Sequence, residues 1–142
     1  MRPHELSPGT TTSAITATAL GLIVALAGTM WHGFIYYFSA SVYLPWGAVL
    51  ALILTFAATI WLVSHTRRAW TGGVMGFTLF LALMYMAFGR ASEGSMLVFM
   101  NTEYAPGAAG TLWSMGSLVS VAAGILVAGF VGARSTSESA RR

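Results

Sequence analysis

The chain has 142 residues, of which 56% are hydrophobic and only 8% are charged, and its mean hydropathy is +0.74. This balance is far from that of a soluble domain and predicts an all-α integral membrane protein with no room for a separate soluble domain. The net charge of +3 is dispersed along the chain, which argues against a nucleic-acid partner. The absence of cysteine excludes disulfides and thiolate metal sites.

Four segments are apolar and long enough to cross a bilayer as helices, at residues 14–38, 45–64, 72–88 and 110–133. A helix rises about 1.5 Å per residue, so even the third segment reaches roughly 26 Å, close to the hydrocarbon thickness of about 30 Å. Residues 1–13 lack the compact basic region of a signal peptide, so we expect the first helix to be retained. The sequence therefore predicts an integral membrane four-helix bundle.

The arginines indicate how this bundle is oriented. In a four-pass topology only Arg90 falls on one side of the membrane, whereas the other side holds Arg2, Arg67, Arg68, Arg134, Arg141 and Arg142. Because cytoplasmic flanks are enriched in basic residues, we predict that both termini are cytoplasmic. Residues 1–13 then form a cytoplasmic tail and residues 89–109 an external cap, while the small polar residues of 134–142 predict a disordered cytoplasmic tail.

Aromatic residues gather near the ends of the predicted helices, and we interpret them as interfacial anchors. Trp61 and Trp70 lie near the predicted inner ends, and those near the outer ends are Tyr36, Tyr37, Tyr43, Trp46, Tyr85 and Trp113.

Small residues spaced by four form a ridge along three of the four helices. They are Ala17, Gly21, Ala25, Thr29 and Gly33 on the first, Gly47, Ala51, Thr55 and Thr59 on the second, and Gly116, Ser120, Gly124, Ala128 and Gly132 on the fourth. Residues four apart share one helix face, and small faces let membrane helices approach closely. We predict that these ridges pack the helices together, within the bundle or against a partner. The third helix is bulky after Gly76, so we expect it at the bundle's edge.

Ionisable residues inside a membrane span point to transport or catalysis, and this chain has almost none. His32 is the only candidate in the predicted spans, and it lies near the outer interface. We expect either a neutral, hydrogen-bonded histidine or a proton-relay or ligand role. With Arg90, Glu93 and Glu103 of the external cap it makes a candidate external polar site. The three histidines are too far apart along the predicted bundle for two to hold one haem iron, so we predict no cofactor, no metal site and no catalytic residues.

The segment "GRASEGSMLVF" and the start of the fourth helix carry a resemblance. An R-x-x-E-G turn after the third helix (Arg90, Glu93, Gly94), an apolar run to Phe99, and Trp113 followed by Gly116 resemble a family of small actinobacterial four-pass membrane proteins of unknown function. The resemblance implies a bacterial plasma membrane and no known activity.

Three functions are compatible with these features. The ridges and the lack of buried charge favour a non-enzymatic accessory or assembly subunit that binds a membrane-protein partner or forms a homo-oligomer in the lipid bilayer. A small oligomeric transporter or exporter is the first alternative, although the membrane-embedded carboxylate of four-pass exporters is missing. A lipid-acting enzyme using His32 with Glu93 or Glu103 is the second, but it lacks a recognisable nucleophile.

Overall fold

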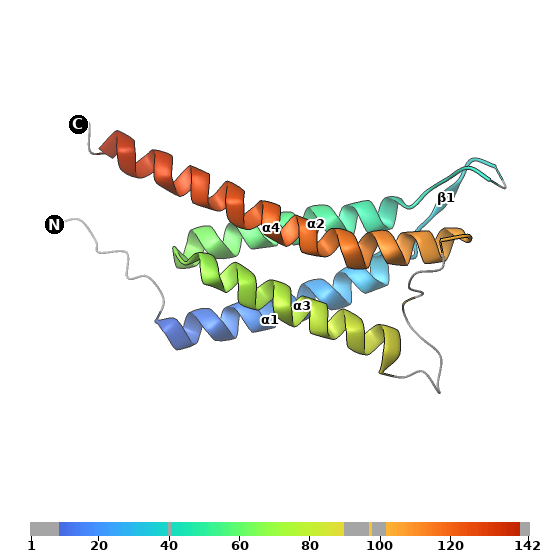
Figure 1. Ribbon diagram of the computed structural model, residues 1–142, viewed down its shortest axis with the longest axis horizontal. Coiled ribbons are helices and arrows are strands. Elements are labelled where there is room, and N and C mark those ends of the chain that lie inside the picture. The colour runs from blue at the N-terminus through green and yellow to red at the C-terminus, as the bar shows by residue number, and fades with distance from the viewer. Residues whose placement is uncertain (1–8, 40, 90–96, 98–101, 140–142) are drawn as a thin grey trace.

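The computed structural model describes residues 9–39, 41–89, 97 and 102–139. Within them the chain forms four helices and a short hairpin (Figure 1): α1 (Thr10–Trp31), β1 (Tyr36–Tyr37), β2 (Tyr43–Leu44), α2 (Trp46–Thr66), α3 (Ala69–Phe88) and α4 (Ala105–Ser139). All four helices are long and apolar enough to cross a membrane. The fold is therefore the all-α membrane bundle that the sequence predicts.

The helices run roughly along the long axis of the molecule (Figure 1). The most extensive contacts are between α2 and α4 and between α1 and α3, and α1 also packs on α2. The start of α1, the turn from α2 to α3 and the end of α4 lie at one end (Figure 1), which we call the basic end because Arg67 and Arg68 form that turn. The opposite end, with β1, β2 and the start of α4, is called the hairpin end.

The first helix ends earlier than the sequence predicts. It stops at Trp31 rather than near residue 38, and the Phe34 N–H donates to the Trp31 carbonyl oxygen (2.9 Å) as the backbone turns. The chain then forms an antiparallel hairpin that pairs Tyr36 with Leu44 and Tyr37 with Tyr43. Hydropathy alone does not separate an aromatic hairpin from the last turns of an apolar helix, although tyrosine does favour strands.

The fourth helix is longer than the predicted 110–133. It begins at Ala105, with Pro106 in the first turn where a missing N–H costs little, and continues through Ser139. The structure therefore differs from the predicted disordered tail at residues 134–139, because a helix that already exists gains a hydrogen bond with each added residue. The predicted tail 1–8 and most of the predicted cap, residues 90–96 and 98–101, lie outside the described residues.

Glycines allow two close backbone approaches inside the bundle. A Cβ atom added at Gly21 of α1 would lie 2.7 Å from the Met75 carbonyl oxygen of α3. One added at Gly124 of α4 would lie 2.8 Å from Cβ of Thr59 on α2. Because real side chains do not come this close, only glycine permits these two helix crossings.

The other small residues of the predicted ridges divide into two groups. Those in the middle of the helices are buried between them: Ala17, Ala25, Ala51, Thr55, Thr59 and Ala128. Gly116 lies under Leu52 and Ser120 is half-buried, whereas Gly33 and Gly132 are on exposed surface near the two ends. The Thr55 and Thr59 hydroxyls donate to carbonyl oxygens one turn earlier in their own helix (both 2.8 Å). The Thr59 hydroxyl oxygen also lies 3.9 Å from the Met75 sulfur of α3, which is a contact with a neighbouring helix.

The third helix has one face in the core and one outside it. Met75, Leu79 and Leu83 are fully buried, while Phe77 is 65% and Leu81 51% exposed. The bulky residues of α3 therefore serve both the interior and the surface, and the contacts of α3 with α1 place it in a wall of the bundle.

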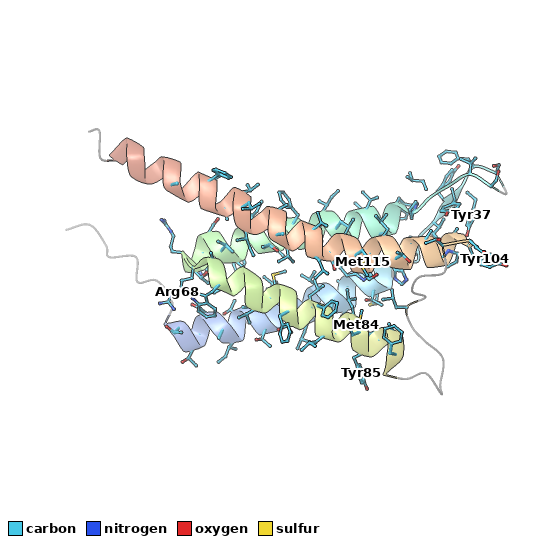
Figure 2. The ribbon with its side chains drawn as sticks, viewed as in Figure 1. Tyr37, Arg68, Met84, Tyr85, Tyr104 and Met115 are labelled. Carbon is cyan, nitrogen blue, oxygen red and sulfur yellow. The ribbon has the colours of Figure 1, made fainter. Side chains whose placement is uncertain are left out.

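A threonine pair fixes the turn at the basic end. The Thr66 and Thr71 hydroxyl oxygens are 2.9 Å apart, so one hydroxyl donates to the other. The second hydroxyl can then donate to a backbone carbonyl, that of Leu62 for Thr66 (2.8 Å) or that of Arg68 for Thr71 (2.7 Å). Arg68 in turn donates through Nη1 to the Thr10 hydroxyl (2.9 Å), which joins this turn to the start of α1. Figure 2 shows Arg68 at this end, opposite Tyr37 and Tyr104.

Candidate functional site

His32 lies directly after α1, at the hairpin end, and its side chain is only 9% exposed. Its ring Nδ1 is hydrogen-bonded to the carbonyl oxygen of Thr29. A carbonyl can only accept, so Nδ1 carries a proton, and in the neutral form of the ring Nε2 is the acceptor.

Trp113 of α4 meets α1 at the same place. Its side chain is fully buried, and its indole N–H donates to the Thr29 hydroxyl oxygen (3.3 Å). The indole ring lies against Gly28, where an added Cβ would be 2.9 Å from ring atom Cε2 and would overlap two further ring atoms. We call Thr29, His32 and Trp113 the Thr29 cluster, because Thr29 contacts His32 through its carbonyl and Trp113 through its hydroxyl.

The interpretation of Trp113 as an interfacial anchor is therefore wrong. It followed from placing the start of the fourth helix near residue 110. The helix begins at Ala105, so Trp113 lies eight residues, or roughly 12 Å, inside it. The signal that could have identified this earlier start was Pro106, since proline is favoured in the first turn of a helix.

The other predicted members of the polar site are not joined to His32. Glu103 is exposed in the turn before α4, and Arg90 and Glu93 lie outside the described residues. Among the residues that the structure does describe, no hydrogen bond or ion pair links Glu103 to His32. Leu97 is fully buried and belongs to the same apolar cluster as Trp113, so the segment before α4 contributes a side chain to the core.

Aromatic side chains also gather at the hairpin end, in and beside β1 and β2. Phe34 stacks on Trp46 with ring centroids 5.5 Å apart, and Tyr37 of β1 contacts Tyr43 of β2 at 6.2 Å. Tyr36 and Tyr37 are both more than half exposed. Exposed tyrosines and a tryptophan at the end of a membrane bundle are typical of the headgroup region, so these residues fit the role of interfacial anchors.

The chemistry that the Thr29 cluster can perform is limited to hydrogen bonding and proton exchange at one imidazole. In the described part of the chain, no three His, Cys, Asp or Glu residues lie close enough together to hold a metal ion. His65 stacks on Trp61 (5.2 Å) at the basic end, so a bundle's length separates it from His32. The arrangement is that of a buried structural contact between α1 and α4.

Comparisons with family models, with curated proteins and with solved structures found no match to this chain. The resemblance to small actinobacterial four-pass proteins therefore stays a prediction from the residues that carry it. The four apolar helices are those of a multi-pass membrane protein.

Proposed function

We propose that this chain is a non-enzymatic accessory or assembly subunit of a membrane complex. The observation that carries the proposal is the uneven burial of its helices. In an apolar 18-residue stretch of each helix, 39% of the residues are buried in α1, α2 and α3, but only 22% are buried in α4. Val119, Leu126 and Phe130 of α4 are each more than 60% exposed. A helix so poorly covered by its own bundle has room for a helix of another subunit.

The seam between α2 and α4 supplies a surface of suitable shape. It is a shallow groove of about 260 Å³, lined by Val49, Leu52, Ile53, Phe56, Val119, Ser120 and Ala123. Small side chains at Ser120 and Ala123 lower the floor of this α2–α4 seam, and such small positions allow close helix packing in a bilayer. We infer that a transmembrane helix of a partner subunit lies along the seam.

The first experiment isolates the full-length tagged protein from its native membrane in mild detergent and identifies co-purifying chains by mass spectrometry. We expect a partner in a fixed ratio to the chain. Ala123→Phe fills the seam and should reduce recovery of that partner about tenfold, because about 1.4 kcal/mol of lost packing has that effect on an equilibrium. Ala19→Phe places the same bulk on an exposed part of α1 and should leave recovery unchanged.

Two outcomes would contradict the proposal. A protein that is monomeric and partnerless in mild detergent is not a subunit of a complex. Equal partner recovery with Ala123→Phe and Ala19→Phe would remove the α2–α4 seam as the contact. A homo-oligomer without any other chain would instead favour the transporter alternative, and flux measurements in proteoliposomes would then be the next experiment.

We also propose that the protein resides in a bacterial plasma membrane with the basic end toward the cytoplasm. The support is that Arg67, Arg68, the start of α1 and the end of α4 share one end of the bundle, so the positive-inside tendency acts on all of them together (Figure 1). Alkaline phosphatase fused after Arg142 should be inactive, whereas phosphatase inserted after Ser39 in the hairpin should be active. The reverse pattern would overturn the orientation.

A further inference from the structure

A second groove opens at the basic end, where α4 leaves the rest of the bundle. Around Gly124, α4 is within backbone contact of α2, and at Gly72 the start of α3 meets Ile125 of α4, 2.5 Å from the position of an added Cβ. Less than two turns later, a Cβ added at Gly129 would meet no atom of the described chain within 4 Å. Figure 1 shows α4 diverging from α2 and α3 toward this end.

The space between the helices is about 460 Å³, within the range of small-molecule sites. We call it the Arg67 groove, and its lining residues are Val63, Ser64, Arg67, Ala69, Ala128, Gly129, Val131 and Gly132. Its lining residues are apolar or glycine, except for Ser64 and Arg67. A ligand that fits must therefore be mostly apolar and carry a group that pairs with arginine.

Arg67 is the charged residue of this lining. It caps the C-terminus of α2 in the left-handed conformation (φ 55°, ψ 28°). Glycine is the usual residue in this conformation, because a side chain is disfavoured there. The neighbouring Arg68 is already hydrogen-bonded to Thr10. Glu103, the acidic residue whose side chain the structure describes, lies at the hairpin end, a bundle's length from Arg67.

The depth of Arg67 in the membrane indicates which charged group of a ligand it would bind. α2 has 21 residues and is about 31 Å long, the thickness of the hydrocarbon core, so the residue directly after it lies at the depth of the lipid headgroups. Arginine binds phosphate oxygens with two parallel hydrogen bonds, and the headgroup phosphate of a phospholipid is found at this depth.

We propose that the Arg67 groove binds one anionic phospholipid, with its phosphate on the Arg67 guanidinium and an acyl chain along the exposed lining residues Ala69, Gly129 and Val131. The two adjacent arginines of the turn and the net charge of +3 favour an anionic over a zwitterionic headgroup. The site is separate from the α2–α4 seam, which lies farther toward the hairpin end, so partner binding and lipid binding can fail independently.

The test is native mass spectrometry of the full-length protein in detergent, titrated with phosphatidylglycerol or phosphatidylcholine of the same acyl chains. We expect one phosphatidylglycerol to bind preferentially. Arg67→Gly suits the left-handed backbone but removes the guanidinium, and it should weaken phosphatidylglycerol binding about tenfold, the effect of one charged hydrogen bond. Arg67→Lys keeps the charge and should retain part of the preference.

Matched control variants distinguish an effect of the Arg67 groove from the effects of losing any positive charge or adding any large side chain. Arg68→Gln removes the same charge one residue away and should keep the preference for phosphatidylglycerol. Gly129→Leu fills the groove and should abolish tight binding of either lipid, whereas Gly73→Leu, on an exposed and uncrowded part of α3, should not. Circular dichroism of each variant verifies that it is folded.

Three results would overturn the proposal. They are equal binding of the two lipids by the unchanged protein, equal loss of preference in Arg67→Gly and Arg68→Gln, and unchanged affinity in Gly129→Leu. Displacement of the bound lipid by millimolar inorganic phosphate would show a free-phosphate site instead. Failure of glycerol phosphate to displace it would support the requirement for an acyl chain.

Discussion

Alanine at position 47 is expected to destabilise the bundle by about 1–3 kcal/mol, the range for overpacking a close contact. A Cβ on Gly47 would overlap the carbonyl oxygen of Trp31 and lie 3.0 Å from Cβ of Phe34. The obstacle is backbone, and it cannot rotate away as a side chain can. Two hydrogen bonds also hold this junction, from Gly47 N–H to the Phe34 carbonyl (3.0 Å) and from Phe34 N–H to the Trp31 carbonyl (2.9 Å). Thermal unfolding of the purified protein in mild detergent, followed by circular dichroism, measures the change.

Gly73→Ala is the matched control for this substitution. Gly73 is also in a helix, but an added Cβ there meets no described atom within 4 Å, so alanine should leave the melting temperature unchanged or raise it through its better helix propensity. If Gly47→Ala and Gly73→Ala unfolded at the same temperature, the close packing of α2 on the end of α1 would be contradicted.

Removing the Trp113 ring should cost about 3–5 kcal/mol of stability, as for other tryptophans deleted from a core. The side chain is fully buried between α4 and α1, and the surrounding backbone at Gly28 cannot easily collapse into the space that the ring leaves. Trp113→Ala also removes the hydrogen bond to the Thr29 hydroxyl, and Trp113→Phe removes that bond while keeping much of the volume. The free energy of unfolding should therefore fall in the order unchanged protein, Trp113→Phe, Trp113→Ala.

Trp61→Ala provides the control for tryptophan loss in general. Trp61 is 54% exposed on α2 and should contribute far less to stability than Trp113. A double-mutant cycle adds a sharper condition: Gly28→Ala should be strongly destabilising in the unchanged protein but much less so in Trp113→Ala, because the atoms that the new Cβ meets have been removed. Additive effects in this cycle, or equal costs for Trp61→Ala and Trp113→Ala, would show that the ring does not fill the space at Gly28.

Gly47 and Trp113 both lie in close helix contacts at the hairpin end. Gly47 packs the start of α2 on the end of α1, and Trp113 packs α4 on α1 beside it. The hairpin end is thus held by close, specific contacts. The basic end differs, since α4 leaves the bundle there and opens the Arg67 groove. We therefore expect substitutions at the hairpin end to change stability, and those in the groove at the basic end to change binding.

Composition and hydropathy alone determined the fold class and the number of membrane-spanning helices. Long apolar stretches must form helices in a bilayer because no water is present to satisfy the backbone hydrogen bonds, so length and hydropathy suffice to identify them. The spacing of small residues also marked positions that are buried between helices, including Ala17, Ala25 and Ala51.

The sites depended on the tertiary structure. Hydropathy carries no information about which apolar aromatic residues face lipid and which face another helix, so Trp113 and the tyrosines of the hairpin looked alike in the sequence. The pairing of Trp113 with Gly28 and Thr29 joins residues more than 80 positions apart and follows from how α1 and α4 are placed. In the same way, Arg67 indicates only membrane orientation until the divergence of α4 leaves a groove beside it. The pattern of apolar residues along the sequence shows which segments lie in the membrane. Which helices contact one another depends on how they pack in three dimensions.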